Sequence, residues 1–167
     1  VKRLEIRVLV DNATADPRFL AEWGLSLYLR TKPQGVGVLF DFGQRGDVLM
    51  HNMRAAGVVA SDPAVLVLSH GHYDHAGGLA SILKERSDRP PLILHPHALL
   101  PKLSMKKGVL RSIGVPAPRS LLEERAALVE ARSPLEVAEG VLFLGEVTRA
   151  GHPEPRGGMY TCLLYTS

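Results

Sequence analysis

Four side chains of types that commonly bind metal ions follow one another closely near the middle of the sequence. They are His70, His72, Asp74 and His75. The apolar, β-branched run 65–68 comes directly before them and predicts a buried strand that ends at Ser69. His70 and His72 alternate, so an extended backbone would send both imidazoles to the same side. Three imidazoles and one carboxylate are a donor set that suits Zn²⁺ or a similar borderline ion.

Each of these residues also has an ordinary structural explanation. A single histidine is usually a polar residue with satisfied hydrogen bonds, and an aspartate before a helix is usually an N-cap. Four such residues at the end of one buried strand are harder to explain in this way. The spacing therefore favours a metal site over the structural explanation.

The rest of the sequence predicts a mixed α/β domain around this strand. In the segment 4–10, Leu4, Ile6, Val8 and Val10 alternate with polar residues, which indicates a strand with one buried face. A hairpin is expected over 25–42, and a helix over 47–56 with Asp47 as its N-cap. The segment 98–118 is expected to form an excursion with a short helix. The other expected elements are a helix at 79–84, a helix from Ser120, and strands at 92–95, 127–131 and 141–147.

Three further polar residues lie where expected strands end. Asp41 stands between Phe40 and Phe42, and an acid in such an apolar setting needs a partner. Its alternative explanation is a carboxylate that caps a turn. His95 and His97 flank a proline, which constrains the backbone, so we expect them at another edge and outside the metal set.

Composition excludes several classes of function. A chain of 167 residues with 46% hydrophobic residues normally forms one folded domain. The net charge of +3 is modest and lacks the clustered basic patch of a nucleic-acid-binding protein. The sequence contains no apolar run long enough to span a membrane, and its single cysteine excludes an internal disulfide. We expect a cytoplasmic protein with no nucleic-acid or membrane partner.

The pattern His70-x-His72-x-Asp74-His75 after a hydrophobic strand resembles the signature of the metallo-β-lactamase superfamily. The resemblance implies an α/β fold, the αββα sandwich, with two divalent metal ions at one edge of its sheets. It implies that His70 and His72 bind the first ion and that Asp74 and His75 bind the second. The expected ion is zinc, with iron or manganese as alternatives. The resemblance also implies that Asp41 lies behind the ligands and orients a ligand histidine.

Several further motifs narrow the resemblance to one branch of this superfamily. In sequence order they are 10–12, 22–26, 39–44, 51–52 and 68–79. Together they resemble the branch of the 7,8-dihydropterin-6-methyl-4-(β-D-ribofuranosyl)-aminobenzene-5′-phosphate synthases. This implies a hydrolase or a synthase-like transferase acting on a small molecule, such as a phosphorylated or pterin-like one. It also implies that Asp74 is a catalytic residue that orients water or relays a proton. The alternative is a non-catalytic protein that binds a metal or a pterin- or phosphate-like ligand.

The length and the last residues lead to two expectations about the ends of the domain. A complete domain of this family needs a second β-rich half, so we expect residues 1–161 to be a partial, N-terminal domain with little activity of its own. The six residues 162–167 match the translation of an adapter used in DNA library preparation, and we expect them to be non-native. The resemblance places the remaining ligands beyond this chain, and His152 is a weaker alternative third ligand.

Overall fold

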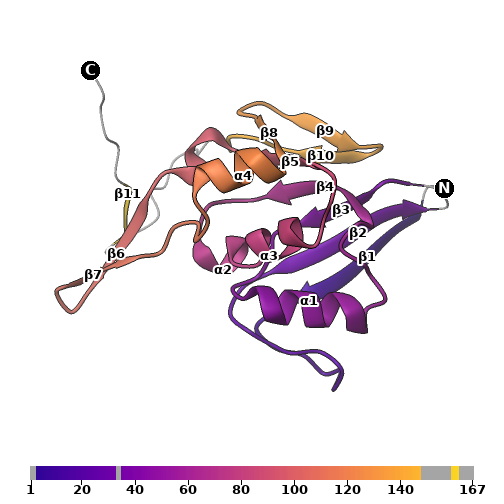
Figure 1. Cartoon of the computed structure of the whole chain (residues 1–167), viewed down its shortest axis with the longest axis horizontal. Coiled ribbons are helices and arrows are strands. Elements are labelled where there is room, and N and C mark those ends of the chain that lie inside the picture. The colour runs from indigo at the N-terminus through magenta and orange to yellow at the C-terminus, as the bar shows by residue number, and fades with distance from the viewer. Residues whose placement is uncertain (1–2, 33–34, 148–158, 162–167) are drawn as a thin grey trace.

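The computed structural model describes residues 3–32, 35–147 and 159–161 (Figure 1). His152 and residues 162–167 lie outside the described residues, so the expectations about them remain predictions. A six-stranded sheet forms the centre of the fold, in the order β1-β2-β3-β4-β5-β8. Its strands are β1 (Arg3–Val10), β2 (Ser26–Lys32), β3 (Gly37–Phe40), β4 (Pro63–Leu68), β5 (Pro91–Leu94) and β8 (Ala127–Glu130). The strands from β1 to β3 pair antiparallel, whereas β3, β4, β5 and β8 pair parallel.

Four helices belong to the core on one face of this sheet: α1 (Gly46–Ala55), α2 (Tyr73–Ala76), α3 (Leu79–Lys84) and α4 (Arg119–Arg125). Alternate residues of the parallel strands, such as Leu66 and Leu68, are fully buried in this core. They pack with apolar side chains of the helices, such as Leu49 and Ile82. Because side chains alternate across a strand, the residues between them must face the other side of the sheet.

On that other side, Val65 and Val67 pack in a second core with Ala138 and Phe143. The latter two belong to a small antiparallel sheet made of β9 (Leu135–Ala138) and β10 (Val141–Phe143). The fold thus has a layer of helices, then the large sheet, then the small sheet. This order agrees with the first three layers of the expected αββα sandwich. The described part of the chain contains no second helix layer.

The expectation that Leu4, Ile6 and Val8 face the core was wrong. These side chains are 49%, 54% and 51% exposed. Their strand does alternate, but the second core on this side of the sheet forms over β3, β4 and β5 and, among the described residues, includes none of β1. The core side of β1 instead carries Arg7, which donates to the carbonyl of Ala56 at 2.6 Å.

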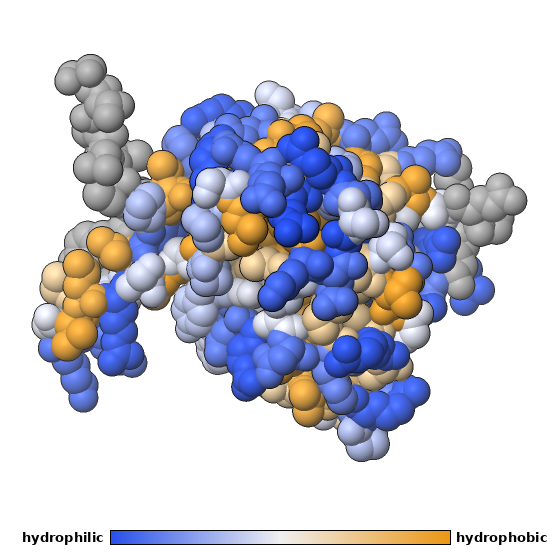
Figure 2. All heavy atoms as spheres, viewed as in Figure 1, coloured by the Kyte–Doolittle hydropathy of each residue, from blue (hydrophilic) through white to orange (hydrophobic). Residues whose placement is uncertain are grey.

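The expectation of a helix within 98–118 was also wrong. The segment forms a short 3₁₀ turn (Pro96–Leu99) and a hairpin of β6 (Lys102–Lys106) and β7 (Val109–Ser112), with β11 (Met159–Thr161) beside β6. Lys107 and Gly108 both have positive φ, 52° and 75°, which is the backbone of a two-residue hairpin turn. This turn explains why strands form here. Figure 2 shows hydrophobic side chains on the projecting hairpin, where Leu110 is 53% exposed.

Smaller differences concern the ends of elements. Arg45, not Asp47, occupies the N-cap of α1, and Asp47 in the first turn forms an ion pair with it. The helix expected from Ser120 begins at Arg119. The strand expected over 141–147 ends at Phe143. No helix in the described ranges has both the length and the apolar character that a membrane crossing requires.

Close backbone packing holds α2 against the loop that follows β3. Phe42 N–H donates to the His75 carbonyl at 2.8 Å, and Gly77 N–H donates to the Gly43 carbonyl at 2.9 Å. A Cβ at Gly77 would lie 1.8 Å from the Gln44 carbonyl oxygen. Glycine is therefore required at position 77 by space, because its φ of −63° is open to any residue.

We predict that Gly77→Ala lowers the free energy of unfolding by about 1–3 kcal/mol, the usual cost of overpacking. It should also shift the imidazole NMR signals of His75, since α2 must move away from the loop. Gly57→Ala is the matched control, because its Cβ would meet nothing within 4 Å and only its φ of +68° is unfavourable. Urea unfolding and histidine NMR measure both effects. Unchanged His75 signals in Gly77→Ala would contradict the packing described here.

Candidate metal centre

The four motif residues lie at the edge of the sheet where β4 ends. Ser69 and His70 directly follow β4, and His72 is the N-cap residue of α2, which contains Asp74 and His75. Because β3, β4 and β5 are parallel, their carboxyl ends meet at this edge. Residues distant in the sequence can therefore reach the motif from both sides.

The motif side chains form one connected group. Nε2 of His70 lies 3.1 Å from Nδ1 of His72. The ring centroids of His70 and His75 are 4.3 Å apart. Nε2 of His75 lies 3.9 Å from an oxygen of Asp74. The structure thus gathers all four residues that the sequence singled out, while their role as ligands remains a proposal.

Asp41 lies behind this group, fully buried, and its carboxylate makes three contacts. It accepts hydrogen bonds from Ser69 N–H at 2.8 Å and from the Ser69 hydroxyl at 2.7 Å. Its Oδ2 also lies 2.7 Å from Nδ1 of His75. Asp41 has a φ of 59°, a left-handed conformation that aspartate tolerates better than most residues. The contact with a motif histidine is the one expected from the sequence.

These contacts determine which nitrogen of two imidazoles carries the proton. His75 donates from Nδ1 to the Asp41 carboxylate, so neutral His75 has its lone pair on Nε2. The single hydroxyl proton of Ser69 goes to Asp41, so this hydroxyl accepts from Nδ1 of His70 at 2.9 Å. His70 therefore also has its lone pair on Nε2. Ser69 is a positioning residue that the sequence analysis missed, although its place between strand and motif was a usable signal.

The environment shifts the pKa values of the three imidazoles in different directions. Burial, helped by the nearby charges of His75 and His72, lowers the pKa of His70 to about 4. Burial also lowers the pKa of His72. The hydrogen bond to Asp41 raises the pKa of His75. At neutral pH, His70 and His72 are therefore uncharged, which is the state that binds a metal.

The donor spacing provides a test of whether an ion fits these residues. Two nitrogen ligands of one tetrahedral zinc ion, each at 2.0–2.1 Å, lie about 3.3 Å from each other. The 3.1 Å between the two nitrogens of His70 and His72 is close to this value. However, within residues 3–32, 35–147 and 159–161 no three histidine, cysteine or acidic side chains are placed to hold an ion together. The residues fit as donor pairs, with fewer ligands than a catalytic zinc site has.

His95 and His97 were expected at another edge, and this was wrong. Leu94 of β5 pairs in parallel with Leu68 of β4, so His95 follows its strand beside Ser69 at the same edge. A cavity of about 570 Å³ is lined by residues from both segments, including Ser69, His70, His95 and His97. The expectation that these two histidines are not ligands remains a prediction.

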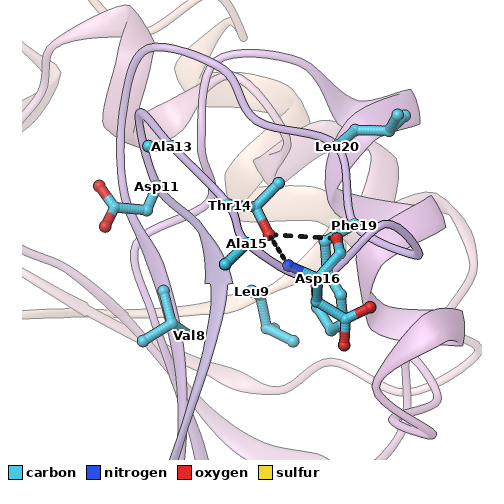
Figure 3. Close-up of a pocket in the computed structure, with 9 residues that line it drawn as sticks. All are labelled: Val8, Leu9, Asp11, Ala13, Thr14, Ala15, Asp16, Phe19 and Leu20. Carbon is cyan, nitrogen blue, oxygen red and sulfur yellow. Dashed lines mark hydrogen bonds between the residues drawn. The ribbon is translucent and has the colours of Figure 1, made fainter.

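A second cavity, of about 330 Å³, lies away from the motif between β1 and the loop that follows it (Figure 3). Its acids are Asp11, which is exposed, and Asp16, which is half-buried. Asp16 bonds with Arg18, and this contact lowers the pKa of the Asp16 carboxyl to about 2. Its lining contains no histidine, lysine or arginine, and one of its two acids is already paired with Arg18. The motif edge is therefore the better candidate site.

We predict that Asp41→Asn lowers the pKa of His75, because asparagine removes the negative charge that favours the imidazolium. The pKa of His75 is higher in the folded protein than the unfolded value of 6.5. The contact between protonated His75 and Asp41 therefore stabilises the fold fully below pH 6.5, and this stabilisation is lost as the pH rises through the folded-state pKa. NMR titration of the imidazoles measures the pKa. Asp16→Asn, which also removes a hydrogen-bonded carboxylate, is the control. An unchanged His75 pKa in Asp41→Asn would refute the contact.

Comparison with known proteins gives a consistent family match. The sequence model of the Metallo-beta-lactamase superfamily matches residues 25–161. Two proteins of Methanocaldococcus jannaschii are similar to the chain. One is named 7,8-dihydropterin-6-methyl-4-(beta-D-ribofuranosyl)-aminobenzene-5'-phosphate synthase, with 27% identity over 82% of this chain and 48% of its own length. The other is an uncharacterized protein, with 31% identity over 86% of this chain and 54% of its own length.

The chain therefore spans about half the length of these curated relatives. Solved structures that resemble it include an N-acyl homoserine lactone lactonase, with 18% identity over 72% of this chain and 49% of the other, at a TM-score of 0.47. Another is a metallo-beta-lactamase of Cronobacter sakazakii, with 28% identity over 45% of this chain and 28% of the other, at a TM-score of 0.38.

Proposed function

Since the chain belongs to the metallo-beta-lactamase superfamily, we propose that it carries one side of a dinuclear metal centre in a metal-dependent enzyme. His70 and His72 would hold one divalent ion, and Asp74 and His75 the other. Zinc suits these donors best, with iron and manganese as alternatives. The observation that supports the proposal most is the Asp41–Ser69 network, which leaves a lone pair on Nε2 of both His70 and His75.

When bound, the ions would polarise a carbonyl or phosphoryl oxygen and lower the pKa of a water molecule. The protein residues supply the arrangement around them. Asp41 fixes the ring of His75 directly and that of His70 through Ser69. Asp74, whose carboxylate lies 3.9 Å from Nε2 of His75, is the residue that would hold or relay a proton at the reacting centre.

The substrate would be a small molecule that carries a phosphate or a pterin-like ring. The support for this is the similarity to a protein named as a dihydropterin-ribofuranosyl-aminobenzene-phosphate synthase. Hydrolysis and group transfer would use the same metal-binding residues, so both remain within the proposal. The activity would belong to a protein that contains this chain together with further ligands.

A non-catalytic metal- or ligand-binding protein is the second candidate. It is favoured by one observation, that the described residues place no three donors around a single ion. Metal content distinguishes the two candidates, because an enzyme of the proposed kind holds two ions per protein.

We predict that the 167-residue chain binds Zn²⁺ weakly and loses it on dialysis, because each ion would have two protein donors. His72→Ala should weaken the binding further, whereas His51→Ala should not change it. His51 is a matched control because it is exposed and contacts the Arg18 carbonyl. Zinc titration and elemental analysis after dialysis measure the effect. Two tightly held ions in this chain would contradict the two-donor description.

We predict that a longer protein containing this chain holds two ions and acts on a phosphodiester, an ester or a dihydropterin substrate. Asp74→Ala should lower its turnover about 10²–10⁴-fold, the usual contribution of a proton-transferring group. Asp41→Asn should weaken metal affinity about 10–100-fold, as for other residues that orient a ligand. Elemental analysis and substrate screens measure both. Undiminished turnover in a metal-free His72→Ala variant would overturn the proposed function.

A further inference from the structure

The cavity that opens beside His70 has a second group of polar side chains on its other wall. Four of them, His95, His97, Lys102 and Glu146, line the cavity, and Arg132 contacts two of these. The guanidinium of Arg132 lies 3.1 Å from a carboxylate oxygen of Glu146 and 2.9 Å from Nε2 of His97. None of these residues has a part in the proposed metal centre.

His95 offers a buried donor with no acceptor. Its Nδ1 accepts a hydrogen bond from the backbone N–H of His97 at 3.1 Å, so the proton of the neutral ring is on Nε2. In the described structure this Nε2 is buried and has no hydrogen-bond partner. Glu146 has the nearest recorded acceptor oxygen, at 3.7 Å, which is too far for a hydrogen bond. An unsatisfied buried donor of this kind is costly unless a ligand completes it.

The cavity also has an excess of positive charge. The ammonium of Lys102 is half-buried and donates to the carbonyls of residues 97, 98 and 100, which do not neutralise its charge. Arg132 is a permanent cation at any physiological pH. Glu146 is the acid in the lining of the same cavity, and its side chain is 61% exposed. Lys102 in the lining and Arg132 in contact with two lining residues thus give two cations against one largely exposed acid.

We propose that this group, named here the His95–Arg132 pocket, binds the phosphate group of the substrate beside His70. In the free protein the Glu146 carboxylate lies where the phosphate would bind, next to Arg132 and His95. The carboxylate bonds to Arg132 at 3.1 Å but stays 3.7 Å from Nε2 of His95, beyond hydrogen-bond distance. A tetrahedral phosphate has enough oxygens to accept a hydrogen bond from both groups. The identity of the ligand as substrate rests on the proposed function, but phosphate binding itself does not require a metal.

The test is an NMR titration of the metal-free 167-residue chain with inorganic phosphate, followed through the imidazole signals of His95 and His97. Saturable binding that shifts Nε2 of His95 is the expected result. Arg132→Ala and His95→Asn should each weaken binding about tenfold, the value of one hydrogen bond to a charged group. His95→Asn retains an acceptor for the backbone N–H of residue 97. Glu146→Gln should tighten binding, since it removes the competing charge.

Arg18→Ala and Asp16→Asn are matched controls, because they alter another exposed arginine–acid pair, joined at 2.7 Å. Neither should change phosphate affinity. An equal loss of phosphate affinity in the controls, or a loss of affinity in Glu146→Gln, would overturn the proposal of a phosphate-binding pocket. Acetate binding as tightly as phosphate would overturn the choice of a tetrahedral anion. Since no metal is present, a failed phosphate titration would refute the pocket and leave the metal centre untouched. Absence of bound metal in a longer protein that contains this chain would refute the metal centre and leave phosphate binding untouched.

Discussion

The carboxylate of Asp41 is the feature on which the arrangement of the site depends. It is fully buried at the end of β3, and three donors converge on it from the neighbouring segment 69–75. A buried carboxylate without partners would be strongly unfavourable, so these donors and the acid stabilise one another. The same contacts fix which ring nitrogen of His70 and of His75 carries the lone pair. One interaction thus connects the stability of the fold with the chemistry of its edge.

The topology explains why this interaction forms. Parallel pairing of β3, β4 and β5 brings three carboxyl ends to one edge, and each end contributes a polar residue, Asp41, Ser69 and His95 in turn. Helix α2 follows β4 closely and packs its backbone on the loop after β3, with no room for a side chain at Gly77. The proposed metal centre and the proposed His95–Arg132 pocket therefore lie next to each other, because His70 also lines the cavity of the pocket.

Local patterns in the sequence predicted much of this arrangement. The buried strand at 65–68 and the grouping of the motif residues follow from short-range spacing. The partner for Asp41 followed from the family resemblance, together with the rule that parallel strands end at one edge. Ser69 was missed because a serine beside a strand end has many ordinary roles. The prediction for His95 rested on the backbone constraint of Pro96, but the parallel register of β4 and β5 places the residue after Leu94 beside Ser69. The exposure of Ile6 was beyond local reasoning, since alternation identifies two faces of a strand but not which of them is covered.

Imidazole NMR of the metal-free chain tests most directly whether Asp41 and Ser69 prepare the histidines for metal. Long-range nitrogen–proton correlations, recorded above the raised pKa of His75, report which ring nitrogen is protonated. Both His70 and His75 should carry the proton on Nδ1, and added Zn²⁺ should shift the Nε2 signals of both. In Ser69→Ala, His70 alone should lose this preference. Protonation of His70 and His75 on Nε2 in the unaltered chain would contradict the proposed metal centre.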